Sequence, residues 1–542
     1  MIRTDVLVIG AGAAGMYAAI AAARSGAQVT LVDRSLIGRG GATVMAQMTV
    51  AVALGEEAPD HWEHHLADTL KAGRGLCDEA LSRLLCEDAA ECIREMDAWG
   101  VGWARARDGN RRHIRQVQAP GHDRPRCVYV DFVNTGPAVS KTLRAQLNRM
   151  PQIRRTGELL VTDLATQAGI CIGAHAVHTT SGDAVPIAAK ATIVATGGLT
   201  RLFQRNSASI NMGGDGYALA LRAGAALVDM EFVQFFPIGH LAPRLVGMDP
   251  IMWDPFRYKL GGKLLNADMQ EFLMEEGRYV SARDHATYAI LMEVAAGRGS
   301  PHGGAWLSFR HCSEAELRSA FGPVIDRLAA NGIDLTRQPI EVAPIAHYHM
   351  GGIRADIDMQ TTLPHLFAAG EAVGGANGAN RLSGNAITEA FTFGRRAGLR
   401  AAALAAKTGM PSIKPKPSAA PSSASVSRIN PAAEIASLQA VMSEHVGPVR
   451  TCAGLERALE HIAALGPECE RFRAPQAGLD PEWIDWHDLR NMRLVAECVT
   501  RAALARTESR GAHQRDDFPQ TSEHWRRHQR VRLSSDGVRL EG

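Results

Sequence analysis

The sequence has few of the features that mark nucleic-acid-binding, disulfide-stabilised or metal-binding proteins. Its 59 lysines and arginines nearly balance its 57 aspartates and glutamates, so it lacks the basic excess that nucleic-acid binding needs. No Cys-x-x-Cys pair occurs, and the nine cysteines are an odd number. That usage is typical of reduced thiols in an intracellular protein and predicts no metal site. We therefore expect a cytoplasmic globular protein, whose 542 residues suffice for roughly three to four domains.

A long apolar run near the start resembles a signal peptide or a short membrane span. The residues from Val6 to Ala23 are uncharged. However, Asp5 precedes the run, three glycines interrupt it, and a second strand-like run at residues 28–32 follows at once. The order strand, turn, helix, strand is a better interpretation, and we predict no targeting signal here or elsewhere.

Glycine is the residue in excess, with 53 copies, about 10% against a usual share of about 7%. Gly10, Gly12 and Gly15 form a G-x-G-x-x-G turn between the first strand and the first helix. The first glycine permits the tight turn, the second lets backbone N–H groups reach a pyrophosphate, and the third lets helix and strand pack closely. Asp33 ends the second strand, where a carboxylate can bind a ribose hydroxyl. The turn predicts a dinucleotide site rather than a fortuitous glycine turn, with NAD and FAD both open.

Two later segments favour FAD. Residues 191–198 form a buried strand that ends in Thr196-Gly197-Gly198, and residues 366–371 form another that ends in Gly370-Glu371. The nucleotide fold is therefore interrupted and resumed, as in a two-domain flavoenzyme whose cap covers the isoalloxazine ring. We predict an α/β protein with a Rossmann-like FAD-binding domain, an inserted α+β cap domain and a C-terminal helical domain.

Several segments together resemble the succinate dehydrogenase and fumarate reductase flavoprotein family, to which L-aspartate oxidase also belongs. Their order and spacing make a chance match improbable, although no single segment decides it. The matching segments are residues 5–47, 60–103, 230–234, 281–284, 346–352, 380–387 and 506–513. The resemblance implies FAD-linked oxidation of a saturated acid at adjacent carbons, or reduction of the corresponding alkene.

The resemblance assigns Arg381 and His347 to the substrate carboxylate. An unsaturated acid accepts hydride only if its carboxylate is held and its charge neutralised, and a guanidinium fork suits that task. A structural ion pair is the alternative for Arg381, and a core histidine is the alternative for His347.

Arg283 matches the acid–base arginine of the family. Because the pKa of free arginine is above about 12, it can donate a proton only if it is closely aligned and resupplied. Family members resupply it through a glutamate followed three residues later by an arginine, and Asp254 and Arg257 have that spacing here. We predict a relay from Arg257 through Asp254 to Arg283, with a surface salt bridge as the alternative.

The flavin-binding residues follow from the same resemblance, with one departure. Family members that attach FAD covalently do so through a histidine, and Ala42 takes its place here, which predicts a dissociable flavin. The predicted cofactor-binding residues are Gly10, Gly12, Ala13, Ala14, Gly15, Asp33, Arg34, Thr43, Ala46, Gln47, Thr196, Gly197, Asp215, Gly370, Glu371, Asn385, Ala386 and Ile387.

The substrate end departs further from the family pattern. Phe236 stands where the family has a histidine that holds the second carboxylate, and Trp253 stands where it has a threonine ligand. An aromatic wall cannot offset the several kcal/mol cost of burying an unpaired carboxylate. We therefore predict poor activity on succinate and fumarate, and a monocarboxylate with an apolar or ring-shaped far end. The alternative is that His240 replaces the missing ligand.

L-Aspartate oxidase activity is disfavoured by a second departure. The pattern of that enzyme places a glutamate before G-G-H-S to hold the substrate amine, and the corresponding stretch here is Ala119-Pro-Gly-His122-Asp123. The amine's counter-charge is missing, unless Asp123 substitutes for it.

The rest of the chain suggests the following organisation. The FAD-binding domain spans residues 1–231 and 346–408 and encloses a capping domain at 232–345. A Pro/Ser/Ala-rich linker at 409–432 leads to a helical domain at 433–520 and a basic tail at 521–542. Two further hypotheses remain open: a flavoprotein subunit that needs an iron-sulfur partner, and a non-catalytic flavin-carrying interaction protein. Neither nucleic acid nor direct membrane insertion is expected.

Overall fold

A computed structural model describes most of the chain. The described residues are 1–47, 49–108, 111–131, 134–207, 209–245, 252–253, 260–273, 283–414, 429–466, 469 and 478–541. The chain divides into two compact units. Residues 1–204, 208–233 and 348–542 form the first unit, and residues 205–207 and 234–347 form the second.

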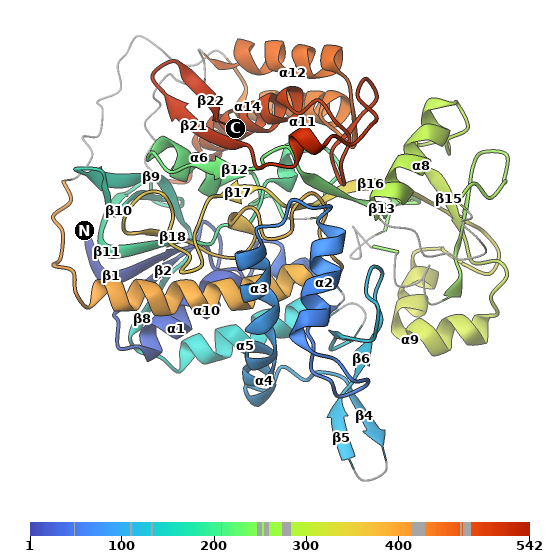
Figure 1. Ribbon diagram of the computed structural model, residues 1–542, viewed down its shortest axis with the longest axis horizontal. Helices are drawn as coiled ribbons and strands as arrows, with labels where there is room; N and C mark the ends of the chain where they lie inside the picture. The colour runs from blue at the N-terminus through green and yellow to red at the C-terminus, as the bar shows by residue number, and fades with distance from the viewer. Residues whose placement is uncertain are drawn as a thin grey trace. The chain divides into compact units, whose positions relative to one another are not determined.

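The main sheet of the first unit has seven strands in the order β8-β2-β1-β11-β10-β9, with β18 paired to β11 (Figure 1). Five of them run parallel: β8 (Ile153–Thr156), β2 (Val29–Val32), β1 (Ile2–Ile9), β11 (Ala184–Val194) and β18 (Leu366–Ala368). β10 (Ile170–His178) and β9 (Leu159–Gln167) add an antiparallel edge. The four strands expected from buried apolar runs all belong to this sheet, because strands covered on both faces need near-continuous apolar sequence.

The helices of the first unit begin with α1 (Ala13–Arg24), which starts at the glycine turn and is buried over almost its whole length. α1 packs along α10 (Asn385–Ala405), so the start of the chain and the residues after 380 share one core. The other helices before residue 230 are α2 (Trp62–Ala72), α3 (Glu79–Glu87), α4 (Ala89–Ala98), α5 (Thr135–Asn148) and α6 (Asp215–Arg222). Short strands connect them: β3 (Val50–Ala51), β4 (Arg105–Asp108), β5 (Arg111–Ile114), β6 (Gln116–Val117) and β7 (Cys127–Val128).

The second unit is built on a four-stranded sheet in the order β13-β16-β15-β14. Its strands are β13 (Val233–Ala242), β16 (Ile340–His349), β15 (Ala305–Ser308) and β14 (Lys263–Leu265). The helices α8 (Arg283–Ala295) and α9 (Glu314–Ala330) accompany it. α9 begins with a capping box, in which Ser313 and Glu316 satisfy each other's backbone N–H groups.

The helices α11 (Pro431–His445), α12 (Cys452–Ala464) and α14 (Pro481–Ala505) follow the linker. They pack against one another, as the helical apolar spacing predicts. Asn430, Thr451 and Asp480 cap their N-termini through side-chain oxygens.

The segment expected as a basic tail at 521–542 ends in a β-hairpin. Its strands are β21 (Arg530–Ser534) and β22 (Gly537–Glu541), and they extend a sheet whose order is β17-β12-β21-β22. β12 (Leu227–Val228) and β17 (Gly352–Ile353) come from the middle of the chain. Val531 is fully buried and Val538 nearly so, so one side of the hairpin packs against the first unit.

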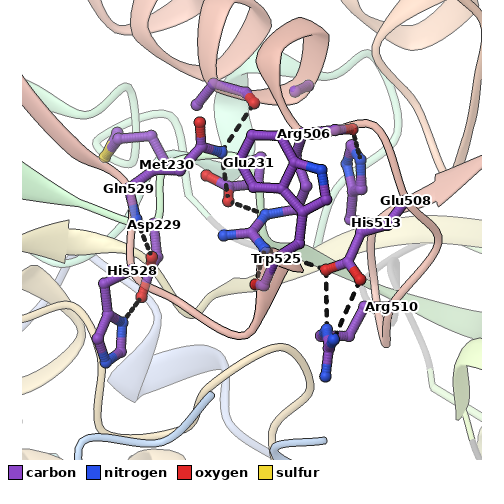
Figure 2. Close-up of polar contacts among 12 residues, drawn as sticks. Asp229, Met230, Glu231, Arg506, Glu508, Arg510, His513, Trp525, His528 and Gln529 are labelled. Carbon is purple, nitrogen blue, oxygen red and sulfur yellow. Dashed lines mark hydrogen bonds and ion pairs between the residues drawn. The ribbon is translucent and has the colours of Figure 1, made fainter. Parts of the chain in front are cut away.

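A buried charged network fixes the segment just before β13 (Figure 2). Nε of Arg506 donates to Oε1 of Glu231 over 2.6 Å, and another guanidinium nitrogen of Arg506 donates to Glu508 over 3.0 Å. Gln529 donates through its side chain to Glu231 over 2.8 Å, and through its backbone N–H to Asp229 over 3.0 Å. Because ions with no exposed side-chain surface are costly unless paired and hydrogen-bonded, each member of this network depends on the others.

Among the helices of the described residues, none combines the length and the apolar character that crossing a bilayer requires.

Candidate functional site

The glycine turn that joins β1 to α1 has the close contacts that exclude side chains. Gly10 adopts a φ of +102°, and a Cβ there would lie 2.4 Å from the carbonyl oxygen of Ala195 on the neighbouring strand connection. A Cβ on Gly15 would lie 1.8 Å from the carbonyl oxygen of Gly10. At Gly12 an added Cβ would meet, among the described residues, only Thr43 Oγ1, at 3.5 Å, so the turn leaves room there for a bound group.

Asp33 lies at the end of β2 against the same turn. Its Oδ2 accepts from the backbone N–H of Ala11 over 2.7 Å, and its Oδ1 accepts from the N–H and hydroxyl of Ser35. These bonds fix the carboxylate beside the turn, at the position where a ribose hydroxyl would meet it. Thr43 also contacts the turn, since its Oγ1 accepts from the backbone N–H of Ala13 over 3.0 Å.

Arg34 and Asp215, both predicted to bind the cofactor, are bound to protein groups. Arg34 makes two hydrogen bonds to Asp488 on α14, of 2.7 and 3.0 Å, and a third to Asp215 over 3.1 Å. Asn491, also on α14, donates to Asp215 over 2.9 Å. Despite burial, the neighbouring Arg34 and Arg201 hold the pKa of Asp488 below its usual range. This cluster ties α14 to the nucleotide domain, a role that the sequence did not suggest.

The carboxyl end of β11 carries Thr196 and Gly197. Gly197 adopts a φ of +76°, and the buried Oγ1 of Thr196 finds no hydrogen-bond partner among the described residues. A buried hydroxyl without a partner is uncommon, because desolvation costs free energy unless a bond replaces the lost water. A polar group of a bound nucleotide at this strand end would satisfy it.

Gly370 and Glu371 follow β18. Oε1 of Glu371 accepts from the backbone N–H of His349 over 3.1 Å, and its backbone carbonyl accepts from the Tyr217 hydroxyl over 2.9 Å. Burial, with the nearby charge of Glu389, raises the pKa of Glu371 to about 8. A glutamic acid that keeps its proton near neutral pH can donate to a ligand oxygen as well as accept.

The first turn of α10 contains Asn385, Ala386 and Ile387. Gly384 precedes it with a φ of +86°. The Asn385 side chain bonds His65 over 2.8 Å, Thr69 over 3.1 Å and Asn377 over 3.3 Å. Burial lowers the pKa of His65 to about 3, so this imidazole is neutral and fixes Asn385 by a hydrogen bond rather than by charge. The side chain of Asn385 therefore orients the helix start, whose backbone N–H groups can meet a flavin.

Ala46 and Gln47 lie in the loop that follows Thr43. Gly136, at the start of α5, packs so closely that its Cβ would lie 2.0 Å from the Thr43 carbonyl oxygen and 2.6 Å from that of Ala46. The backbone of this loop is therefore held against α5, and Thr43 fixes it at the N-terminus of α1, beside the glycine turn.

His347 ends the second unit's part of β16 and is half-buried. Its Nδ1 lies 2.7 Å from Oγ of Ser207, and its ring packs edge-on against Phe236 with a centroid distance of 5.4 Å. A hydroxyl that donates to Nδ1 leaves the ring proton on Nε2, which can then donate to an anion. No sequence motif pointed to Ser207, which lies 140 residues before its partner.

Phe236 and Trp253, which replace polar ligands of the family pattern, are both fully buried. Trp253 donates through Nε1 to Nδ1 of His240 over 3.2 Å, and Nε2 of His240 contacts the carbonyl oxygen of Pro243. Since Nδ1 accepts, Nε2 carries the proton and donates. Both nitrogens of His240 are thus engaged by protein groups.

Arg381 belongs to the first unit and is 5% exposed. Its guanidinium carbon lies 4.4 Å from the ring centroid of Tyr348, and one of its nitrogens donates to the carbonyl oxygen of Leu382 over 3.4 Å. Tyr348, which sequence reasoning missed, directly follows His347 in the motif Ala346-His-Tyr-His-Met.

Only part of the predicted proton relay lies within the described residues. Asp254 and Arg257 lie outside them, and Arg283 is described only as the first residue of α8. His347 and Arg381 belong to different units. The convergence of Arg283, His347 and Arg381 therefore stays a prediction.

The glycine turn, the carboxylate beside it and the unpartnered Thr196 hydroxyl fit a dinucleotide, which places this chain in the class of Rossmann-like dinucleotide-binding proteins. Comparison with known proteins agrees. Residues 5–387 match the FAD binding domain family, and residues 435–541 match the family described as fumarate reductase flavoprotein C-term. The chain belongs to the succinate dehydrogenase and fumarate reductase flavoprotein family, and it is an FAD-dependent oxidoreductase.

Individual relatives cover nearly the whole chain. A fumarate reductase (CoM/CoB) subunit of Methanothermobacter marburgensis is 33% identical over 96% of both chains. L-Aspartate oxidase of Streptomyces coelicolor is also 33% identical, over 99% of this chain and 92% of its own. Among solved structures, Sdh1 of Mycobacterium smegmatis in complex with UQ1 has a TM-score of 0.86 at 34% identity, covering 100% of this chain and 94% of that one. An E. coli quinol fumarate reductase variant has a TM-score of 0.89 at 29% identity, with 100% and 96% coverage.

Proposed function

We propose that the protein oxidises or reduces a carbon–carbon bond next to a carboxylate, with a monocarboxylic acid whose far end is apolar as its substrate. Bound FAD supplies hydride exchange at one carbon. We further propose that the flavin is held non-covalently, since Ala42 occupies the position of the family's attachment histidine.

In this proposal Arg381 and His347 hold the substrate carboxylate. Arg381 offers a planar fork of donors, and its stacking on Tyr348 restricts the orientation of that fork. His347 contributes a donor at Nε2 when Ser207 donates to Nδ1. Arg283 exchanges the proton at the neighbouring carbon and is resupplied by Asp254 and Arg257.

The hydrogen bonds of His240 are the main observation that supports a monocarboxylate as the substrate. Phe236 and Trp253 replace the two polar ligands of the family pattern, and both are fully buried. His240, the alternative ligand, bonds Trp253 and the Pro243 carbonyl with its two nitrogens. A second carboxylate would have to break one of these bonds, and an unpaired buried carboxylate costs several kcal/mol. This arrangement supports an apolar far end.

Asp123 was the candidate counter-charge for an amino-acid substrate. Two nitrogens of Arg124 donate to it over 3.0 and 2.7 Å, and Arg126 donates to it as well. Hydrogen bonding to Arg124 lowers the pKa of Asp123 to about 2. Because its charge is already compensated, Asp123 is a poor partner for a substrate amine, which argues against L-aspartate oxidation.

A second candidate function is that of a flavoprotein which works with an iron-sulfur partner. The relative from Methanothermobacter marburgensis is named as one subunit of its enzyme, which favours this function. Turnover of the purified chain with a dye or with oxygen would separate a self-sufficient enzyme from one that needs a partner. A cytoplasmic location stays a prediction that cell fractionation tests.

The experiment that tests the proposal is a screen of carboxylic acids. Saturated acids are added to the oxidised flavoprotein and unsaturated acids to the reduced one, and flavin absorbance near about 450 nm is followed. We expect crotonate, cinnamate or a similar monocarboxylate to react at least about 100-fold faster than succinate, fumarate or L-aspartate, since that ratio corresponds to about 2.7 kcal/mol.

The matched variant is Phe236→His combined with Trp253→Thr, which restores the family's polar ligands. It should gain activity with fumarate or succinate and lose activity with the apolar acid. Equal turnover of succinate or fumarate by the unaltered protein would overturn the proposal.

A further inference from the structure

The guanidinium carbon of Arg381 lies over the Tyr348 ring, 4.4 Å from its centroid, and neither residue is exposed by more than 5%. A guanidinium that stacks on a ring face keeps its N–H donors in the plane parallel to that face, so the ring fixes the direction in which the donors point. The position of Tyr348 therefore controls the direction of the carboxylate-binding fork.

Tyr348 is itself held by a buried carboxylate on α10. Its hydroxyl donates to Oε2 of Glu389, a residue with no exposed surface. The amide nitrogen of Asn377 donates to the same Oε2 over 2.9 Å and lies 3.3 Å from the Tyr348 hydroxyl oxygen. Glu389, Asn377 and the hydroxyl thus form a closed triangle that permits one orientation of the ring.

The second oxygen of Glu389 is not satisfied in the same way. Oε1 is buried and has no hydrogen-bond partner among the described residues. Burial raises the pKa of Glu389 to about 7, while Tyr348, Asn377 and Arg381 each act to lower it. A carboxylate in so costly a position needs a compensating charge, and Arg381 is the cation that acts on it across the Tyr348 ring.

We propose that Glu389 and Tyr348 are positioning residues for Arg381, which hold its guanidinium in the orientation that receives the substrate carboxylate. The inference rests on the proposed function, in which Arg381 binds that carboxylate. A hydrogen bond from the phenol to a carboxylate increases the electron density of the ring, which strengthens its attraction for the cation.

A similar pair elsewhere in the first unit provides the control. The Tyr17 hydroxyl on α1 donates to Glu95 on α4, and Tyr17 is 1% exposed. Its arginine, Arg24, bonds Glu95 directly and lies over Trp99 instead of over the tyrosine. Tyr17→Phe and Glu95→Gln therefore remove the same kind of bond without acting on Arg381.

The first measurement does not depend on any substrate. Butane-2,3-dione modifies accessible guanidinium groups, and peptide mass spectrometry gives the rate at each arginine of the flavin-loaded protein. We expect Glu389→Gln to increase the rate at Arg381 about 5-fold, and Tyr348→Phe to increase it about 2-fold because the ring is retained. The buried Arg126 is the internal reference, and Tyr17→Phe and Glu95→Gln should leave both rates unchanged.

The second measurement is the dissociation constant for crotonate and cinnamate, read from the change that they cause in the flavin spectrum. We expect Glu389→Gln to weaken binding about 10-fold and to raise KM by a larger factor than it lowers kcat, since the missing group orients a binding residue. Tyr348→Phe should weaken binding less. The control variants should bind as the unaltered protein does.

The outcomes separate the two proposals. If the unaltered protein binds neither acid, the proposed function fails for these substrates, while the modification rates still decide whether Glu389 positions Arg381. An unchanged rate at Arg381 together with unchanged affinity in Glu389→Gln would overturn the inference. If Glu389→Gln does not fold, Tyr348→Phe decides by the same two measurements, and an equal rise at Arg381 and Arg126 would show a general structural role only.

Discussion

Oγ of Ser207 lies 2.7 Å from Nδ1 of His347, and this bond joins residues that are 140 positions apart in the sequence. It determines which ring nitrogen of His347 carries the proton. We expect Ser207→Ala to weaken carboxylate binding about 5-fold, the effect of losing one hydrogen bond of about 1 kcal/mol. The measurement is the dissociation constant for crotonate across the pH range in which histidine titrates.

Ser207→Thr is the control for that prediction, because it retains a hydroxyl on the same carbon. It should bind within about 2-fold of the unaltered protein. Equal binding by Ser207→Ala would show that the hydroxyl does not influence the substrate.

The flavin should leave the protein on denaturation. Ala42 has no nucleophilic side chain, and it precedes the short 3-10 helix at Thr43–Met45. Acid precipitation followed by centrifugation should leave the yellow colour in the supernatant, where chromatography identifies FAD. Colour that stays with the pelleted protein would show a covalent bond formed by another residue.

Replacement of Gly15 by alanine should abolish flavin binding. The added Cβ would lie 1.8 Å from the Gly10 carbonyl oxygen, so the turn would have to open and its N–H groups would lose their direction. The ratio of flavin to protein absorbance measures the loss, and we expect less than about 10% of the normal occupancy.

Gly26→Ala serves as its control at the other end of the same helix. Gly26 has a φ of +89°, and no atom of the described residues lies within 4 Å of an added Cβ. Its replacement costs backbone strain of about 1 kcal/mol, and flavin occupancy should stay normal. Retained flavin in Gly15→Ala would contradict the role of this turn.

Glu389 should make stability depend on pH in a defined direction. Burial raises its pKa from 4.5 to about 7. The stabilisation that protonated Glu389 gives to the folded state is fully present below about pH 4.5. It is lost as pH rises through about 7, because Glu389 releases its proton at lower pH in the unfolded chain than in the folded one. The difference in Tm between Glu389→Gln and the unaltered protein should therefore grow in favour of the variant between about pH 5 and about pH 8.

The size of that effect is at most about 3 kcal/mol in the free energy of unfolding, from the shift in pKa. The charge of Glu389 also acts on Glu371, so the variant lowers the pKa of Glu371 and the measured difference includes that change. A difference that shrinks as pH rises would show that Glu389 is ionised at low pH in the folded state.

The nucleotide-binding part of the fold could be predicted from the sequence because its signals are local. An apolar run before a glycine turn predicts a buried strand, and β1 and β2 lie where the runs around Gly10 and Asp33 indicate. The contacts of Asp33 with the turn also follow from that pattern.

Contacts between distant positions could not be predicted in this way. Tyr348 and Glu389 meet across 41 residues, and neither residue type at its position indicates the other. Arg34 stays a predicted cofactor ligand, but its hydrogen bonds to Asp488 on α14, 454 residues later, could not be predicted from its place after Asp33. Such pairings arise when whole helices and strands pack together. The local sequence pattern around either residue does not predict them.

The last hairpin shows how composition can hide a strand. Basic residues dominate the segment around residue 530, and this composition led to the prediction of a basic tail. Its alternation of arginine with Val531 and Leu533 was the period-two signal of a strand, and Val531 is indeed buried. The strand signal consisted of only two apolar residues, so the basic composition of the segment determined the prediction.

The partners of Asp229 also bear on how the chain folds during synthesis. His528 and Gln529 bond Asp229 from about 300 positions further along, and β21 pairs with β12 beside them. A ribosome adds about 5–20 residues per second, so β12 emerges tens of seconds before the strand that pairs with it. Until then its edge is an open template for other chains, which makes this interval the stage at which chaperone protection would matter most.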